Sequence, residues 1–300
     1  MKEKFKVLTI LGSPHDKKSN TRALVEDFVD DVATFGLDLT HEIVALGRKE
    51  VKPCKGCWAC TRGKLCPIKD DLQEIKTKMV ECDMLILASP VYTNQITAQM
   101  KALFDRLFTW CHIYPLLGKY GLSIVTTGNE GHGETGEFLE KMLATYGTYS
   151  FGSVQSIGGF TPGFFPWRQK AREKNKKLAQ KVAKTILQGK KPSSHSVQKK
   201  IYKVMKNKMN GIHAVNSMVY GIPNGQPNPS KLHLKILPII FKRLKMNESQ
   251  IKKWGDILAF ELSWWRDRGW LRTKSLKQLQ HMADANDFDV KSRLLLNHEN

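Results

Sequence analysis

Short apolar runs alternate with helical patterns along the first 190 residues. The apolar runs predict strands at Lys6–Leu11, Leu39–Ala45, Asp83–Ala88, Leu122–Thr126 and Phe151–Ile157. The amphipathic segments between and after them predict helices at Thr21–Ala33, Asp70–Val80, Thr97–Cys111, Glu134–Tyr146 and Arg168–Leu187. This alternation is typical of a parallel sheet that is covered by helices on both faces. We therefore expect a doubly wound α/β domain of five parallel strands, in which ligands bind beyond the carboxyl ends of the strands.

The pattern changes after Gly189–Ser196, a stretch of Lys, Pro, Ser and Gly that is typical of a domain boundary. Residues 191–300 are predicted to form a basic, mainly helical region. One helix is expected from Asn247, within a sequence that resembles a capping box, to a stop at Gly269. The chain is therefore divided into a domain of residues 1–190, which contains a cysteine loop at 54–66, and a C-terminal region of residues 191–300.

Composition and charge narrow the class of protein. Hydrophobic residues make up 41% of the chain and charged residues 25%, which is a globular composition and excludes disordered and fibrous proteins. The sequence contains neither a stretch of about 18 uncharged apolar residues, which a spanning helix needs, nor a signal peptide. We therefore expect a cytoplasmic protein.

The basic residues are concentrated in the second half of the chain. Residues 1–150 contain equal numbers of basic and acidic side chains, so the whole net charge of +20 belongs to residues 151–300. The simplest interpretation is a small helical domain with solvated lysines and a core of tryptophans. Docking to an anionic membrane surface, which would make the protein membrane-peripheral, and binding to an acidic partner such as a ferredoxin remain alternatives. A nucleic-acid partner is the least favoured.

Four of the six cysteines lie within thirteen residues, in the spacing C-x2-C-x2-C-x5-C. A structural disulfide framework is not expected in a chain without an export signal. Thiolates at three-residue intervals on one loop are typical of a [4Fe-4S] cluster, whereas zinc sites usually join two pairs from separated segments. A cluster is therefore favoured, with zinc or free redox-active thiols as alternatives. The candidate metal ligands are Cys54, Cys57, Cys60 and Cys66; Cys82 and Cys111 lie in or beside apolar stretches and are predicted to be packing residues.

The loop after the first predicted strand, Gly12–Thr21, has the composition of an anion site. It contains small and hydroxylated residues and opens a helix, where backbone N–H groups and the helix dipole favour a negative charge. This suits a terminal phosphate. Because the Walker pattern and a GxGxxG sequence are both absent from the loop, a nucleoside triphosphate or a dinucleotide is less favoured there. The alternative is a simple helix cap on a turn.

The loops after the third and fourth strands suit a planar ring. Ser89–Asn94 contains Tyr92, which offers an aromatic face and a hydroxyl group beside backbone donors, although it could equally cover the core. The segment Thr126–Gly133 contains the first two glycines of a formal GxGxxG pattern, Gly131 and Gly133, and Gly136 completes it. This pattern is not a dinucleotide fingerprint, because it follows the fourth strand and has no acidic residue about 20 positions later. A flexible loop that closes over the edge of the ring is the better interpretation.

The three loops together resemble a known family. They are similar to those of the NADPH-dependent FMN reductase superfamily, and within it to those of the iron-sulfur flavoproteins. The matching features are Gly-Ser-Pro with Ser-Asn-Thr, Ser-Pro-Val-Tyr followed by Lys101 and Asp105-Arg106, and the cysteines ahead of Asp70-Asp71. The resemblance covers residues 1 to about 187 and implies a flavodoxin-like fold and an FMN cofactor. The FMN-binding residues that it implies are Ser13, Lys18, Ser19, Asn20, Thr21, Pro90, Val91, Tyr92, Thr93, Asn94, Thr127, Gly128, Asn129 and Gly131.

The expected function is that of an FMN-dependent oxidoreductase. It would pass electrons between NAD(P)H or a reduced ferredoxin and an acceptor, with a [4Fe-4S] cluster as a second centre. The alternatives are an NAD(P)H-dependent FMN or quinone reductase without a cluster, and a non-enzymatic flavin electron carrier that docks by its basic half. The family further implies a homo-oligomer in which a cluster approaches the flavin of the partner subunit. No acid–base or nucleophilic constellation is present, so we expect no catalytic side chain.

Overall fold

The computed structural model describes residues 4–62, 64–192 and short segments between 199 and 251. Most of the predicted region 191–300 lies outside the described residues. Of the helix predicted from Asn247 to Gly269, only the start is described. The predicted role of the basic half in binding partners therefore also falls outside the described residues. At its start, Asn247 and Gln250 exchange two hydrogen bonds of 2.9 Å between side chain and backbone, which confirms the capping box.

The core of the described chain is a five-stranded parallel sheet with the strand order β2-β1-β3-β4-β5. The strands are β1 (Phe5–Leu11), β2 (Leu39–Ala45), β3 (Met84–Pro90), β4 (Tyr120–Thr127) and β5 (Tyr149–Ile157). β3 and β4 are buried almost throughout, as expected for strands that are covered on both faces. The predicted doubly wound, flavodoxin-like sheet is therefore confirmed.

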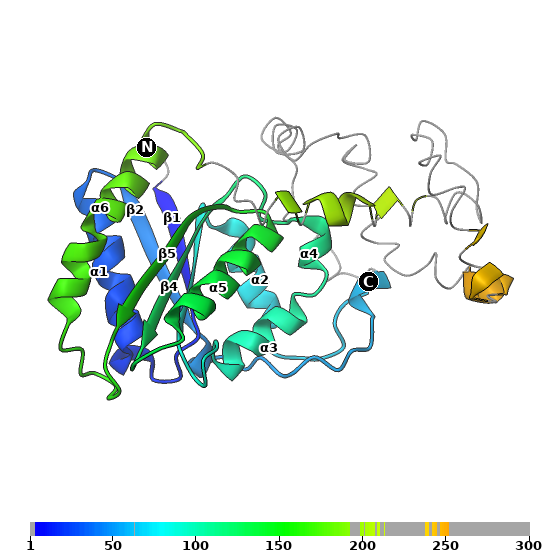
Figure 1. Cartoon of the computed structure of the whole chain (residues 1–300), viewed down its shortest axis with the longest axis horizontal. Coiled ribbons are helices and arrows are strands. Elements are labelled where there is room, and N and C mark those ends of the chain that lie inside the picture. Colours follow the sequence, from blue (N-terminus) through cyan, green and yellow to red (C-terminus); the bar gives the residue numbers. More distant parts are fainter. Residues whose placement is uncertain are drawn as a thin grey trace.

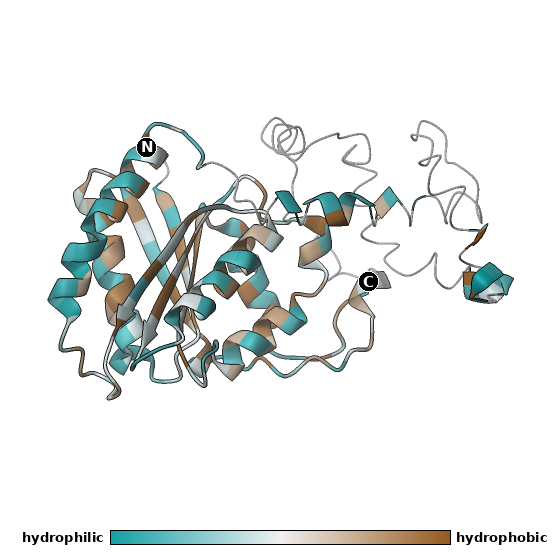
Figure 2. Ribbon diagram, viewed as in Figure 1, coloured by the Kyte–Doolittle hydropathy of each residue, from teal (hydrophilic) through white to brown (hydrophobic). Residues whose placement is uncertain are grey.

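Helices cover both faces of the sheet (Figure 1). They are α1 (Asn20–Thr34), α2 (Leu72–Glu81), α3 (Ala98–Arg106), α4 (Trp110–Ile113), α5 (His132–Tyr146) and α6 (Arg168–Leu187). One apolar core joins α1 and α6 to the sheet, and a second joins α2, α3, α4 and α5 to its other face. The apolar sides of the helices turn toward the strands and their polar sides outward (Figure 2). None of the helices in the described part of the chain combines the length and the apolar character that crossing a bilayer requires.

The predicted single helix Thr97–Cys111 is wrong: the chain forms α3 and α4 with a turn between them. The amide of Leu107 bonds to the carbonyls of both Leu103 and Phe104, which closes the last turn of α3. After the break, Trp110 is completely buried and its ring lies 5.6 Å from that of Tyr146 on α5. Burial of this large aromatic side chain outweighs the gain from continuing one straight helix.

Ion pairs fix α6 against α1. Asp27 accepts two hydrogen bonds from Arg168, at 2.7 and 2.8 Å, and Asp31 pairs in the same bidentate way with Arg172. The two carboxylates are buried, while the arginines are partly exposed. Bidentate geometry restricts orientation as well as distance. The start of α6 is therefore held beside the carboxyl end of the sheet.

Candidate functional site

The three loops singled out in the sequence meet in one cavity at the carboxyl ends of the strands. The cavity has a volume of about 460 Å³, which lies in the range of small-molecule sites. Its lining consists of Ser13, His15, Ser19, Asn20, Thr21, Pro90, Val91, Tyr92, Thr93, Thr126, Thr127, Gly128, Gly159, Phe160 and Pro162. Four of the expected binding residues do not line it: Lys18, Asn94, Asn129 and Gly131.

Hydroxyl groups gather at one end of this cavity, where α1 begins. The Ser19 hydroxyl accepts a hydrogen bond from the amide of Arg22 at 3.2 Å and caps the helix. The hydroxyl groups of Thr21 and Thr126 lie 2.6 Å apart. Ser13 is 2% exposed, and its hydroxyl accepts from the amide of His15. A helix N-terminus surrounded by hydroxyl groups can bind an anion such as a phosphate.

Asn20 connects the loop after β1 to a fourth wall of the cavity that the sequence analysis missed. Its amide nitrogen donates to the carbonyl of Gly158 at 2.7 Å and to those of Thr161 and Phe164 at 3.1 Å, and its oxygen accepts from the amide of Gly163 at 3.1 Å. The segment after β5 therefore closes the cavity with its residues 159–162. The signal that could have located it is its position after the fifth strand, at the same edge of the sheet.

The loop after β3 presents its aromatic residue from a tight turn. Tyr92 and Gln95 exchange two backbone hydrogen bonds, at 2.8 and 3.1 Å. Thr93 and Asn94, between them, have φ values of 49° and 59°, a left-handed conformation that is uncommon outside glycine. Such strain is concentrated at functional sites. Partial burial raises the pKa of the Tyr92 phenol, so this group is protonated at neutral pH.

The loop after β4 approaches the same turn closely. Gly131 has a φ of 79°, and a Cβ atom there would lie 2.9 Å from Oδ1 of Asn94. A Cβ atom on Gly128 would lie 2.4 Å from the ring of Phe160. Glycine at these two positions therefore allows the close approach of this loop to Asn94 and Phe160. The Thr127 hydroxyl stabilises the loop by donating to the carbonyl of Glu130 at 2.5 Å.

The cysteine loop lies apart from this cavity and projects beyond α3 (Figure 1). All four clustered cysteines line a second, smaller cavity of about 90 Å³, together with residues of α2 and the end of α3. Cys54 and Cys57 are exposed, and Cys60 and Cys66 are partly buried. In the described ranges, no three side chains of the His, Cys, Asp and Glu types are arranged so that they could hold a metal ion. Of the predicted packing cysteines, Cys82 is buried and Cys111 is partly exposed.

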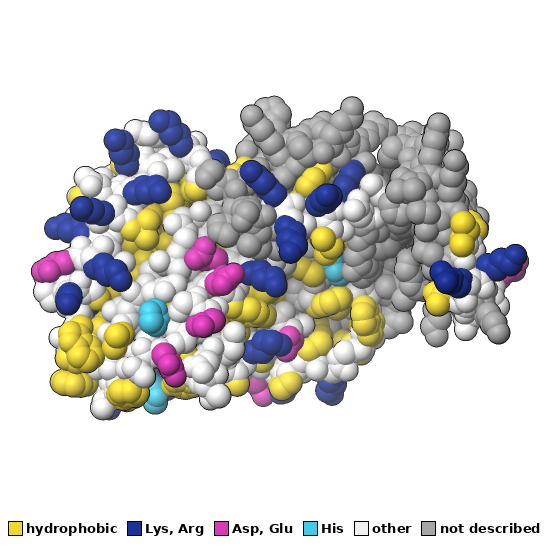
Figure 3. Space-filling model, viewed as in Figure 1, with side chains coloured by type: hydrophobic (Ala, Val, Ile, Leu, Met, Phe, Trp, Pro, Cys, Tyr) yellow, Lys and Arg dark blue, Asp and Glu magenta, His cyan; other side chains and the backbone are white. Residues whose placement is uncertain are grey.

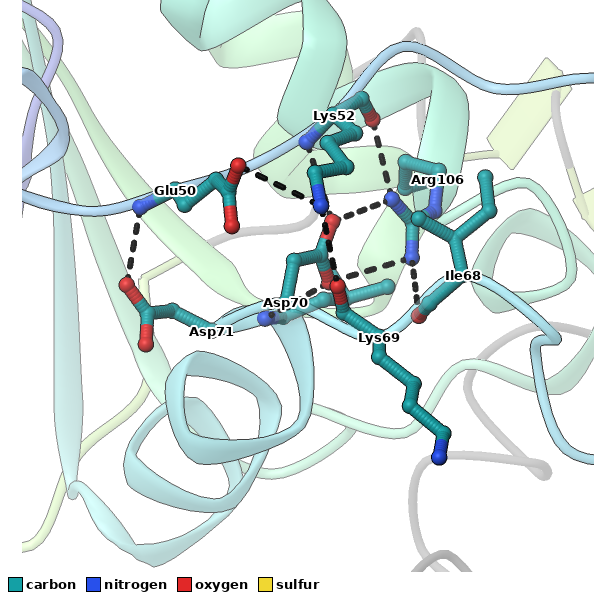
Figure 4. A network of polar contacts seen from close by, with 8 residues as sticks. Glu50, Lys52, Ile68, Lys69, Asp70, Asp71 and Arg106 are labelled. Carbon is teal, nitrogen blue, oxygen red and sulfur yellow. Dashed lines mark hydrogen bonds and ion pairs between the residues drawn. The ribbon is translucent and has the colours of Figure 1, made fainter.

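A buried ion pair fastens both ends of the cysteine loop (Figure 4). The guanidinium group of Arg106 donates to the carboxylate of Asp70 at 2.6 and 3.2 Å, and both side chains are 1% exposed. The same guanidinium donates to the carbonyl of Lys52, before the cysteines, at 2.9 Å, and to that of Ile68, after them, at 3.5 Å. The amide of Lys52 also donates to Asp70 at 2.9 Å. The loop is therefore held between two anchored segments.

The cavity beside the cysteines is positively charged. Arg106 lines it, and so does the half-buried Lys76 of α2. Burial lowers the pKa of the Lys76 ammonium group, and its interaction with Cys60 and Cys66 opposes this shift. The cations at this cavity would stabilise an anionic group bound there.

The chain is similar to several known proteins. The family model for NADPH-dependent FMN reductase matches residues 5–161. An iron-sulfur flavoprotein of Archaeoglobus fulgidus is 34% identical over 155 residues, which cover 51% of this chain and 69% of the relative. An iron-sulfur flavoprotein of Methanosarcina thermophila is 33% identical over 160 residues, which cover 52% of this chain and 82% of the relative. The solved structure of RosB with bound 8-demethyl-8-formylriboflavin-5'-phosphate is 15% identical, with a TM-score of 0.48, and covers 81% of this chain and 88% of that one.

Proposed function

The chain belongs to the NADPH-dependent FMN reductase family and is a flavin-dependent oxidoreductase, and from this premise we propose that it transfers electrons from NAD(P)H through FMN and a [4Fe-4S] cluster to an acceptor. The observation that carries the proposal is the single cavity of about 460 Å³, which has hydroxyl groups at a helix N-terminus on one side and aromatic side chains on the other. This combination suits a ring that carries a phosphate.

The residues of the large cavity fit FMN by their chemistry. We assign the phosphate to the start of α1, where Ser19 and Thr21 present hydroxyl groups beside backbone N–H groups. The loops after β3 and β4 would line the isoalloxazine ring, with Tyr92 as its aromatic neighbour. When bound, FMN supplies electron and hydride transfer, while the protein contributes position and electrostatics. The chain therefore needs no acid–base side chain of its own to carry out this chemistry.

The cysteine loop fits an iron-sulfur cluster by its donor set. Four thiols line one small cavity that also contains Lys76 and Arg106, and thiolates are the ligands of such clusters. The printed names of the two relatives, iron-sulfur flavoproteins, favour a cluster over zinc. We propose Cys54, Cys57, Cys60 and Cys66 as its ligands. A cluster would supply one-electron transfer, and the Arg106–Asp70 ion pair holds the loop that would bind it.

The assembly is proposed to be a homodimer. The cysteine loop projects away from the sheet (Figure 1), and an exposed apolar patch lies in its neighbourhood. The patch consists of Trp58, Leu65 and Phe108, of which Trp58 is 53% exposed. Exposed apolar patches of this kind mark interaction surfaces. We also propose that the flavin domain ends near residue 190, because α6 ends at Leu187.

Anaerobic purification of the full chain tests the proposal. We expect one FMN, four iron and four sulfide per chain, and reduction of an artificial acceptor by NADPH. Absorption spectroscopy with flavin, iron, sulfide and zinc counts measures the first expectation, and steady-state turnover the second. A colourless protein that does not bind added FMN at micromolar concentration would contradict the flavin assignment. Zinc in place of iron would contradict the cluster, and reduced flavin without NADPH turnover would indicate an electron carrier.

Replacement of one proposed ligand separates the two centres. We expect Cys57→Ser to lose most of the iron and sulfide and to retain FMN, because Cys57 is exposed and lies outside the large cavity. Cys111→Ser is the matched control, since this thiol donates to the carbonyl of Phe108 in the turn before α4 and is not among the described residues that line the cysteine cavity. Equal iron contents in the two variants would show that Cys57 is not a ligand.

A further inference from the structure

A third cavity, of about 320 Å³, lies next to the proposed flavin site. Its lining consists of His132, Gln155, Ser156, Ile157, Trp167, Lys170, Ala171 and Lys174. At the end of β5, Ile157 lines this cavity and Gly159 lines the flavin cavity. Two residues of chain span at most about 7 Å, so the two cavities are neighbours. Residues that line the two cavities therefore lie within reach of one elongated ligand.

Two lysines give the third cavity its charge. Lys170 and Lys174 are exposed, lie one helical turn apart on α6, and form no ion pair with any residue of the described segments. The two arginines of the same helix segment turn toward α1, where Arg168 forms an ion pair with Asp27 and Arg172 forms one with Asp31. None of the described residues that line the cavity carries a carboxylate. The two ammonium groups are therefore available to an anion.

The other walls suit an aromatic ligand with polar groups. Trp167 is 50% exposed and Ile157 is 43% exposed, so both offer apolar surface at the rim. Figure 3 shows hydrophobic side chains gathered where β5 leads into α6, with basic side chains beside them. His132 contributes a ring whose Nδ1 is shielded from solvent and has no hydrogen-bond partner among the described residues. The cavity thus combines an indole face, a histidine and two cations.

We propose that this third cavity binds the phosphorylated adenosine end of NADPH. Lys170 and Lys174 would contact its 2'-phosphate, which NADH lacks, and Trp167 would stack on the adenine, while the rest of the dinucleotide reaches toward the flavin cavity. Charge-assisted hydrogen bonds to phosphate are among the strongest that side chains form, and indole faces stack well on aromatic rings. The inference rests on the proposed function, because it identifies NADPH as the donor of that reaction and predicts a lower KM for NADPH than for NADH.

The test uses a ligand that undergoes no redox chemistry. The dissociation constant of adenosine 2',5'-bisphosphate is measured by calorimetry with the flavin-loaded full chain, together with the KM and kcat for NADPH and NADH. The test variant is Lys170→Met/Lys174→Met. The matched control is Lys177→Met/Lys181→Met, which removes two exposed lysines with the same spacing from the same helix but outside the cavity.

We expect the bisphosphate dissociation constant and the KM for NADPH to rise about tenfold or more in the test variant, with kcat and the KM for NADH nearly unchanged. The control should behave like the wild type. Equal effects in the two variants, or no bisphosphate binding by the wild type at millimolar concentration, would overturn the inference. The inference would also be overturned if the wild type bound only an acidic protein and the test variant lost that binding. If the bisphosphate binds as expected but NADPH does not reduce the flavin, the proposed function fails and the site remains.

Discussion

Replacing Ser19 with Asp is expected to weaken FMN binding by about 100-fold or more without loss of stability. Ser19 caps α1 and lines the proposed flavin cavity. Asp caps a helix as well as Ser does, so the fold should tolerate the change. Its carboxylate would face the flavin phosphate, and two like charges about 4 Å apart repel by roughly 4 kcal/mol at an effective dielectric constant near 20. A loss of about 100-fold corresponds to about 2.7 kcal/mol.

The control is Ser19→Asn, which caps the helix without adding a charge. Flavin fluorescence titrations with FMN and with riboflavin, which lacks the phosphate, measure the effect. Ser19→Asp should weaken the binding of FMN but not that of riboflavin. Ser19→Asn loses the hydroxyl group without adding a charge, so it should bind FMN much more tightly than Ser19→Asp does. If Ser19→Asp bound FMN normally, the phosphate would lie elsewhere. If it lost riboflavin to the same degree, the change would act through the shape of the cavity and not through the phosphate.

Replacing Arg106 with Met is expected to lower the free energy of unfolding by about 3–5 kcal/mol. The substitution leaves the carboxylate of Asp70 buried without its cation, and it removes the hydrogen bonds to the carbonyl groups on both sides of the cysteine loop. Urea unfolding measures the change. Lys101→Met is the control on the same helix, because its exposed pair with Asp105 is worth less than about 1 kcal/mol. Similar losses in the two variants would show that the buried pair has no special role.

The same ion pair predicts a pH dependence. Burial raises the pKa of the Asp70 carboxyl, but hydrogen bonds from Arg106 and from the amides of Lys52 and Leu72 outweigh this and leave the pKa below its usual value. A lowered pKa in the folded state stabilises the protein above the unfolded-state pKa of about 4, and this stabilisation is lost as the pH falls through the folded-state pKa. In Arg106→Met the uncompensated burial should raise the folded-state pKa of Asp70, so this variant should lose less stability on acidification than the wild type does, and Arg106→Met/Asp70→Leu should recover part of the stability.

Much of the fold could be predicted from local patterns. The alternation of apolar runs and helical periods identified all five strands and placed the ligand loops at one edge of the sheet, as the structure confirms. The break between α3 and α4 could not be predicted, because it depends on the burial of Trp110 against Tyr146, far away in the sequence. The position of the segment after β5, at the carboxyl edge of the sheet, could have been predicted from the sequence, but the contacts that hold it against the cavity could not. Only the folded chain brings Asn20 to the carbonyl groups of that segment.

The sequence by itself determined the fold class, the three loops of the flavin cavity and the thiol donor set, because these follow from periodicity and from residues that are close along the chain. The tertiary structure decided which residues share a cavity. Arg106 reaches Asp70 and Lys52 across 36 and 54 positions, and Lys170 comes to lie beside His132 at a cavity next to the flavin site. Contacts of this kind depend on how helices pack on the sheet, and no local pattern encodes that packing.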